Sequence, residues 1–115
     1  MDLIKAMTVA QAGTQRAGSC TVALAVLQPE RHSSGGPTLT AAVLGDAGIR
    51  VVRAGAVVFV SVLQEFEFQV PYQIGCPEWH DTTNAPEDAA VVDLALQEGD
   101  VVLMGSDGVR SPSLP

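Results

Sequence analysis

The fold is decided by the stretch TLTAAVLGDAGIRVVRAGAVVFV, which covers residues 38–60. Its apolar runs are rich in β-branched residues, and they are interrupted by Gly45-Asp46-Ala47-Gly48 and by Ala54-Gly55. Short runs of this kind between glycine-containing turns predict strands. We therefore expect three strands, over residues 38–44, 49–53 and 56–62, that follow one another as an antiparallel meander.

The residues before this stretch predict a helix and then a further strand. Apolar residues recur at three- and four-residue spacing from Leu3 to Ala10, and Asp2 stands where an N-cap belongs. A helix is therefore predicted over residues 2–17, ended by the glycine that follows. The short apolar run 19–27 predicts a strand that is buried on both faces, and the polar residues 30–37 predict a loop.

The second half of the chain predicts fewer regular elements. Residues 66–73 can form only an edge strand, because Pro71 lacks the N–H that a central strand needs. Residues 75–90 are rich in Pro, Asp, Thr and Asn without periodicity, so an exposed loop is expected. Two short apolar runs, 91–96 and 101–105, predict the last strands.

Composition sets the class of molecule. The 115 residues are 47% hydrophobic and 17% charged, which favours one folded domain or less over a disordered acidic tail. The net charge of −7, with six scattered Lys and Arg, excludes a nucleic-acid partner. No apolar run approaches the roughly 18 residues of a membrane span, so a soluble protein is expected. Cys20 and Cys76 are predicted to be reduced thiols that are buried or half-buried.

Two aspartates stand out as candidate metal ligands. Asp46 and Asp107 each follow a strand predicted to be buried, and each is followed by small residues. A carboxylate held rigidly at a strand end suits a hard cation such as Mg²⁺ or Mn²⁺. Ordinary turn chemistry, in which the side chain caps its own backbone, explains the same pattern and remains open. His32 and His80 have no spacing typical of a ligand pair and are predicted to be surface residues.

The order of motifs resembles the middle of the metal-dependent protein phosphatase family, the protein phosphatase 2C type. The similarity extends from about Leu3 to Val109, and the Pro-aromatic-Gln element resembles the phosphatase-7-like (PTC7-type) branch. It rests on these segments: Gly18-Ser19-Cys20-Thr21-Val22-Ala23, residues 39–48, Val51-Val52-Arg53, the step from Arg53 to Gly55, Phe68-Gln69-Val70-Pro71-Tyr72-Gln73 and residues 99–109.

This resemblance implies an α+β fold, a partial α-β-β-α four-layer sandwich with mainly antiparallel strands and one N-terminal helix. It also implies a pair of Mg²⁺ or Mn²⁺ ions and a water that attacks a phosphoserine or phosphothreonine protein substrate directly. By the same resemblance, Asp107 matches the late Asp-Gly metal ligand with Gly108 beside it. Asp46 matches a turn aspartate that reaches a further, more weakly held ion.

The chain also departs from the family pattern. The early Asp-Gly-x-Gly-Gly segment and the late Asp-Asn pair of the family are absent, and Arg110 brings positive charge close to Asp107. We therefore expect residues 1–110 to be the central portion of a phosphatase domain that is weak or inactive alone, with a frayed tail at 111–115. One helix is too little to cover two sheets, which predicts a bare sheet face and self-association through it.

Two other interpretations remain beside a serine/threonine phosphatase. The first is a non-catalytic pseudophosphatase or interaction module that binds a phosphoprotein or a partner. The second is an unrelated small β-sandwich, in which Gly99-Asp100-Val101-Val102-Leu103 would be a common turn and strand. The sequence shows no targeting signal, and a mitochondrial or plastid location is suggested by analogy with the family branch alone.

Overall fold

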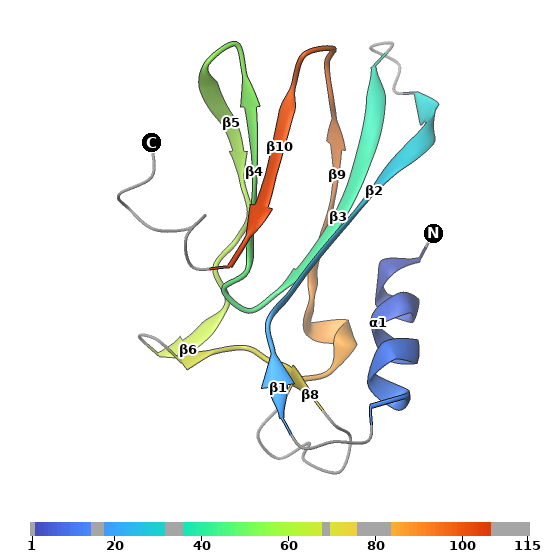
Figure 1. The fold of residues 1–115 in the computed structure, drawn as a ribbon, viewed down its shortest axis with the longest axis vertical. Coiled ribbons are helices and arrows are strands. Elements are labelled where there is room, and N and C mark those ends of the chain that lie inside the picture. Colours follow the sequence, from blue (N-terminus) through green and yellow to red (C-terminus); the bar gives the residue numbers. More distant parts are fainter. Residues whose placement is uncertain (1, 15–17, 32–35, 68–69, 76–83, 107–115) are drawn as a thin grey trace.

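The computed structural model describes residues 2–14, 18–31, 36–67, 70–75 and 84–106. Two three-stranded antiparallel sheets face each other, and helix α1 (Leu3–Ala12) covers the outer side of one of them (Figure 1). The order of layers is therefore helix, sheet, sheet. These are three of the four layers expected, and the α+β class with mainly antiparallel strands and one N-terminal helix is confirmed.

Helix α1 begins as predicted and ends earlier. The Asp2 side chain accepts a hydrogen bond from the Lys5 amide at 3.1 Å, so Asp2 is the N-cap. The expected extension to residue 17 was wrong, because Gly13 is the C-cap and its N–H donates to the Val9 carbonyl. Leu3 and Met7 are buried on the side that faces the sheet.

The sheet under α1 has the order β2-β3-β9. Its strands are β2 (Val22–Arg31), β3 (Pro37–Leu44) and β9 (Ala90–Ala95). The expected end of the first strand at residue 27 was wrong. β2 continues past Pro29 to Arg31 with a register shift after Gln28, because an edge strand tolerates a residue without an N–H.

The edge position of β2 also corrects its expected burial. Residues 22–26 are only partly buried and Leu27 is 61% exposed, so β2 is not covered on both faces. The loop expected over residues 30–37 is shorter, since β2 ends at Arg31 and β3 begins at Pro37. Residues 32–35, which include His32, lie outside the described residues.

The second sheet has the order β10-β4-β5. Its strands are β10 (Val101–Gly105), β4 (Gly48–Arg53) and β5 (Ala56–Val60). The predicted strand 101–105 is confirmed, and the strand predicted to reach residue 62 ends at Val60.

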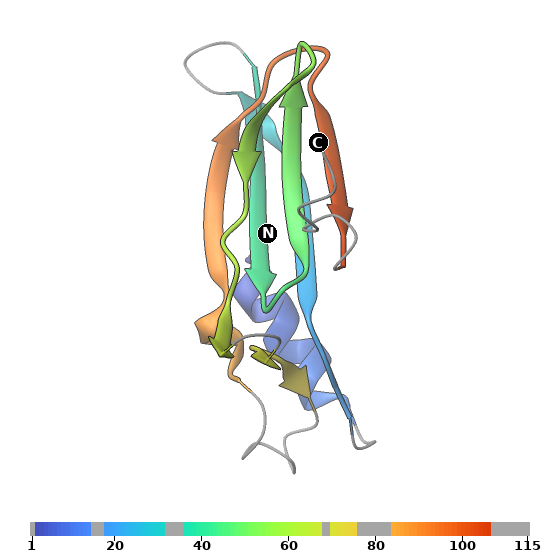
Figure 2. The same cartoon turned by 90° about the vertical axis from the view of Figure 1, so that its left-hand side faces the viewer.

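The predicted meander was wrong at one connection. β3 and β4 do not pair, because the turn between them carries the chain from one sheet to the other (Figure 2). Val43 on β3 and Ile49 on β4 belong to the same buried cluster between the sheets. Burying both apolar runs against each other in this way removes more surface from water than pairing them edge to edge.

Small apolar side chains fill the space between the two sheets. Ala41, Val43 and Ile49 form one buried cluster, and Leu39, Val51 and Leu96 form a second one beside it. On the opposite side of the β2-β3-β9 sheet, α1 contributes to a third cluster, whose buried members are Leu3, Met7, Ala42, Leu44 and Ile74.

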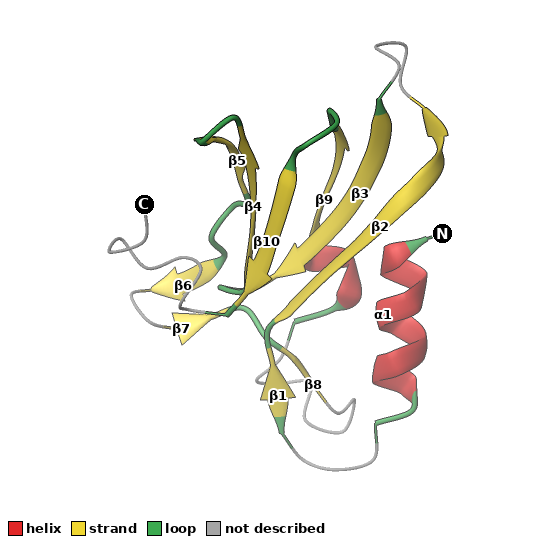
Figure 3. Cartoon of the chain, turned by 45° about the horizontal axis from the view of Figure 1, so that its top comes forward, coloured by secondary structure: helices red, strands yellow, loops and turns green. Residues whose placement is uncertain are grey.

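Short elements close the lower end of the sandwich in Figure 1 (Figure 3 labels β7 as well). The expected edge strand at 66–73 is replaced by β6 (Glu65–Glu67) paired with β7 (Val70–Pro71). β1 (Ser19–Cys20) pairs with β8 (Ile74–Gly75). Within the expected loop 75–90 a 3-10 helix, η2 (Pro86–Asp88), precedes β9, and residues 76–83 lie outside the described part.

The outer face of the β10-β4-β5 sheet carries exposed apolar side chains. Val101 and Leu103 are 51% and 46% exposed and alternate with Val102, which packs between the sheets. Among the described residues no helix lies on this face (Figure 3). As far as the structure describes the chain, this outer sheet face is bare, as expected. No helix in the described part of the chain has both the length and the apolar character needed to cross a membrane.

Candidate functional site

The acidic turn, Gly45-Asp46-Ala47, connects the two sheets at the lower end of the sandwich in Figure 1. Leu44 before it is fully buried, and Ala47 is 6% exposed. Asp46 between them is half-buried and engaged in an interaction of its own. Both flanks of the aspartate are thus anchored in the core, while Asp46 itself remains partly exposed.

Gly45 has a backbone conformation that only glycine adopts readily. Its φ is +98°. A Cβ atom at this position would lie 2.3 Å from the Tyr72 carbonyl oxygen and 2.5 Å from Cγ2 of Thr21. The close approach of these two groups explains why a glycine precedes the aspartate.

Gln64 makes four hydrogen bonds, two of them to Gly45 of the acidic turn. Its side-chain Oε1 accepts from the Gly45 N–H at 2.9 Å, and its own N–H donates to the Gly45 carbonyl at 3.1 Å. Its Nε2 donates to the Asp88 carbonyl at 2.8 Å, and its carbonyl accepts from the Tyr72 N–H at 3.0 Å. The turn is therefore tied to η2 and to the segment before β8.

The end of β10 lies beside the acidic turn. Gly105 pairs with Gly48, the first residue of β4, so Ser106 continues at the level of the turn. The next two residues, Asp107 and Gly108, are outside the described residues, as is the tail 111–115. The structure thus brings the described end of β10 to Asp46 and does not position the second predicted ligand.

The described residues fit part of a cation site. In the ranges that the structure describes, no group of three or more His, Cys, Asp or Glu residues is close enough to hold a metal ion. The Asp46 carboxylate is a hard oxygen donor of the kind that Mg²⁺ and Mn²⁺ prefer. One such donor is too few for a tight site.

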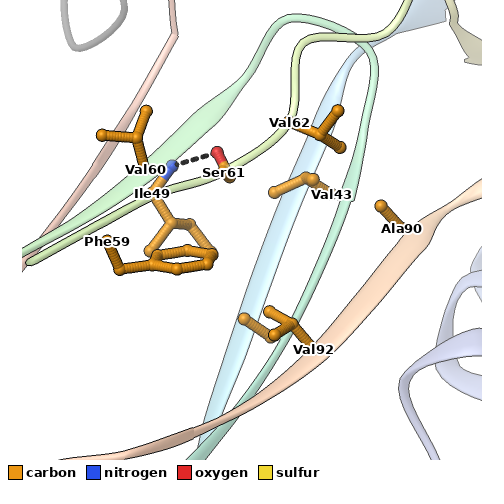
Figure 4. Close-up of a pocket in the computed structure, with 9 residues that line it drawn as sticks. Val43, Ile49, Phe59, Val60, Ser61, Val62, Ala90 and Val92 are labelled. Atoms are coloured by element: carbon orange, nitrogen blue, oxygen red, sulfur yellow. Dashed lines mark hydrogen bonds between the residues drawn. The ribbon is translucent and has the colours of Figure 1, made fainter.

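A cavity of about 230 Å³ lies between the sheets, on the side where β5 and β9 face each other (Figure 4). Apart from Ser61, its lining is apolar: Ala41, Val43, Ile49, Phe59, Val60, Val62, Ala90 and Val92. The Ser61 hydroxyl accepts a hydrogen bond from the Ile49 N–H at 2.9 Å, and the Ser61 N–H donates to the Ile49 carbonyl. This serine closes the end of the β4 ladder and offers no nucleophile.

The opposite end of β4 carries an ion pair. Arg53 Nε and Nη2 donate to the two carboxylate oxygens of Asp100 at 2.9 and 2.8 Å. These bonds, together with one from the Gln97 N–H, lower the pKa of Asp100 to about 2. The same pair raises the pKa of Arg53. Asp100 is therefore committed to structure, far along β4 from the acidic turn.

The remaining polar candidates show no catalytic arrangement. The Ser19 hydroxyl donates to the side-chain carbonyl of Gln73. The expected burial of Cys20 was wrong: it is an exposed free thiol, because both residues of the short strand β1 are exposed. Cys76 and His80 lie outside the described residues. None of the described residues adds a nucleophile paired with a base.

Sequence reasoning missed Gln64 and Ser61. Both are polar residues in the otherwise apolar run that continues from β5, and this isolation was the available signal. Their partners, Gly45 and Ile49, are more than ten residues away in sequence, so only the fold reveals the role of the two side chains.

Comparisons with known proteins bear on the family and the fold of the chain. No family model matches the chain. A probable protein phosphatase 2C of Oryza sativa subsp. japonica is 38% identical over 99 residues, which are 86% of this chain and 27% of the relative. A protein phosphatase PTC7 homolog of Xenopus laevis is 36% identical over 96 residues, 80% of this chain and 31% of the relative.

A solved structure shares the fold. The X-ray structure of the photosystem II phosphatase PBCP matches with a TM-score of 0.79 and 36% identity, over 93% of this chain and 39% of that one. The fold and the acidic turn therefore define part of a phosphatase-type sandwich. The chain belongs to the protein phosphatase 2C family, whose members are metal-dependent, and it spans 27% and 31% of the two curated relatives described above.

Proposed function

We propose that residues 1–110 are the central portion of a metal-dependent protein serine/threonine phosphatase domain. Such a domain hydrolyses phosphoserine and phosphothreonine esters in protein substrates. The observation that carries the proposal is the match over 93% of the chain to a solved phosphatase at a TM-score of 0.79. The position of Asp46 at a strand end beside the end of β10 supports it.

The proposed cation ligands are Asp46 and Asp107, with Gly108 as the adjoining turn residue. Bound Mg²⁺ or Mn²⁺ would activate a water molecule and offset charge on the phosphoryl oxygens. The role of the chain is to hold Asp46 between the buried Leu44 and Ala47, so that its carboxylate oxygens would face a cation in a fixed place.

The isolated chain is proposed to be weak or inactive. Mg²⁺ and Mn²⁺ sites need several oxygen ligands at once, and the described residues bring no three candidate ligands together. The activity then belongs to the complete domain, of which this chain is one part. An organellar location, mitochondrial or plastid, stays a prediction by analogy with the family branch.

The first test uses the purified chain. Mn²⁺ is titrated into it by calorimetry, and hydrolysis of a phosphothreonine peptide is measured with and without metal. We expect weak binding and no turnover. Tight binding of two ions, or metal-dependent turnover, would contradict the incomplete site.

A second test places the chain in a complete domain. The chain replaces the matching part of the photosystem II phosphatase, and hydrolysis of the same peptide is measured. We expect activity that Asp107→Ala abolishes and that Asp46→Ala weakens. Asp93→Ala is the matched control, because Asp93 is an exposed carboxylate on β9 whose side chain accepts a hydrogen bond from Thr40. An active chimera that tolerates both site substitutions would overturn the assignment of the ligands.

The bare outer face of the β10-β4-β5 sheet supports a second candidate, a non-catalytic interaction module that associates with itself. Val101 and Leu103 expose apolar surface there that a second copy would bury. Sedimentation equilibrium should show a dimer that Leu103→Glu dissociates. Val91→Glu, an exposed valine on β9 of the other sheet, should leave it intact. A monomeric wild-type chain would contradict this candidate.

A further inference from the structure

We infer that Gln64 is a positioning residue, which fixes the place of the Asp46 carboxylate by holding the backbone of the acidic turn. This inference rests on the proposed role of Asp46 as a cation ligand. Gln64 itself touches neither cation nor substrate in this assignment. Its effect is exerted through Gly45, the residue directly before the aspartate.

The first step is that every polar group of Gln64 forms a hydrogen bond. Its N–H, carbonyl, Oε1 and Nε2 each make a hydrogen bond, at 3.1, 3.0, 2.9 and 2.8 Å respectively. Two of the four engage Gly45, which thereby has both its N–H and its carbonyl bound to a single residue. Four hydrogen bonds favour a single rotamer of the Gln64 side chain, and the two that reach Gly45 favour a single backbone conformation of the turn.

The second step is the close packing around Gly45, which leaves the turn no room to move. Gly45 is buried, and the Tyr72 carbonyl and the Thr21 methyl group lie against its Cα, where a Cβ would meet them at 2.3 and 2.5 Å. The Tyr72 segment is in turn bound to Gln64 through the Tyr72 N–H. Gln64 thus fixes both the turn and the wall against which the turn packs.

The third step concerns Asp46 itself. On its N-terminal side the peptide bond that joins Gly45 to Asp46 has its carbonyl bound to Gln64. On its C-terminal side Gly48 pairs with Gly105 of β10. The aspartate therefore lies between two fixed points, and a catalytic site requires its ligands to be fixed to within a fraction of an ångström.

The amide side chain suits this position for an electrostatic reason. A carboxylate in place of Gln64 would accept from the Gly45 N–H, but it would face the Asp88 carbonyl without a donor. A lysine would donate to the Asp88 carbonyl but could not accept a hydrogen bond from the Gly45 N–H. Only a group with one acceptor and one donor meets both partners, and it adds no charge that would compete with Asp46 for a cation.

The experiment compares three variants of the full chain by amide hydrogen exchange. Gln64→Met keeps the size of the side chain and removes both side-chain bonds, while Gln64→Glu keeps the acceptor for Gly45. Gln11→Met is the matched control, because Gln11 is half-buried and its Nε2 donates to the Gly75 carbonyl, away from the turn. We expect exchange of the Gly45 amide to accelerate about tenfold in Gln64→Met. It should change little in Gln64→Glu and in the control.

A second readout follows the aspartate. Mn²⁺ is added to the ¹⁵N-labelled chain, and broadening of the Asp46 amide resonance reports even weak binding. We expect the apparent Mn²⁺ affinity at Asp46 to fall about tenfold in Gln64→Met and to stay unchanged in the Gln11→Met control. Gln64→Glu is compared by Gly45 exchange alone, because its added carboxylate can attract Mn²⁺ itself. A purely structural role would lower the global stability of Gln64→Met and leave the Mn²⁺ affinity of the folded protein unchanged.

The two proposals fail in different ways. Absence of broadening at Asp46 in the wild-type chain contradicts the role of Asp46 as a ligand, whatever Gln64 does. Unchanged Gly45 exchange in a folded Gln64→Met variant overturns the positioning role, whatever binds at Asp46. If Gln64→Met does not fold, Gln64→Glu tests the positioning role. Loss of Gly45 amide protection in Gln64→Glu, which keeps the acceptor, would contradict the assigned contact between the Gly45 N–H and Oε1.

Discussion

The two ends of β4 are held by different chemistry. At one end Arg53 and Asp100 form a two-pronged ion pair, and the side chain of Asp100 is only 2% exposed. At the other end a neutral residue, Gln64, binds the backbone of the acidic turn. The first end has its opposite charges satisfied within the protein, and the second uses an uncharged amide to hold a loop that carries a carboxylate.

This difference contrasts two ways of fixing the ends of one strand. A bidentate ion pair that is complete within the fold stabilises the structure. The amide of Gln64 instead fixes the backbone directly before Asp46, the proposed cation ligand. The predictions below contrast the two ends, beginning with the largest effect on the free energy of unfolding.

The largest effect is expected for Gly45→Ala. The substitution strains a backbone at φ +98° and places a methyl group 2.3 Å from the Tyr72 carbonyl oxygen, so we expect a loss of about 3 kcal/mol or more. The matched control is Gly55→Ala at the Arg53 end of β4, where φ is +81° and the space is open; a cost of about 1 kcal/mol is expected. Urea unfolding measures both, and equal costs would contradict the close packing at Gly45.

Ser61→Ala should have the next largest effect. The substitution leaves the Ile49 N–H without its side-chain acceptor in a buried place, for an expected loss of about 1 to 2 kcal/mol. The control is Ser106→Ala, an exposed serine beyond the end of β10, with an effect within about 0.5 kcal/mol. The same urea titration distinguishes them, and a neutral Ser61→Ala would show that the bond is dispensable.

The ion pair predicts a dependence of stability on pH. The pKa of Asp100 is about 2 in the folded protein against an ordinary 3.8, so the folded state favours the ionised carboxyl group. The stabilisation is fully present above about pH 4 and is lost as the pH falls towards 2. Both Asp100→Asn and Arg53→Met should flatten this part of the stability profile. A profile that keeps its slope in both variants would contradict the pairing as its cause.

The smallest effect on folding is expected for Asp46→Asn. Asparagine keeps the size of the side chain and one carbonyl-type oxygen acceptor, so the free energy of unfolding should change by less than about 0.5 kcal/mol. The same substitution should remove the Mn²⁺-induced broadening at residue 46. A large loss of stability would assign Asp46 to the fold instead.

The sequence predicted the strands of the sandwich where the apolar runs are bounded by glycine. Residues 49–53 and 101–105 became β4 and β10 almost residue for residue, because their turns contain glycines at positive φ, such as Gly55 and Gly99. The helix end was missed, since the prediction took Gly18 as the residue that ends the helix, whereas Gly13 is the C-cap. The pairing of strands was missed too, because a tight turn is compatible with both a hairpin and a crossing between sheets.

The ligand role of the turn aspartate, predicted from its place after an apolar run, stays a prediction. The residue that holds the turn was not predicted. Gln64 contacts Gly45 and Asp88 from a loop. Contacts between residues so far apart in the sequence produce no regular pattern from which they could be predicted. The role of Asp107 stays a prediction, as it lies outside the described residues.

The strand order has a consequence for how the protein is made. Each sheet contains a strand from the last third of the chain: β9 pairs with β3 in one, and β10 pairs with β4 in the other. Neither sheet can therefore be completed on the ribosome until these late strands emerge. Contacts so distant along the chain slow folding, and until they form, the half-built sheets present open edges to other nascent chains.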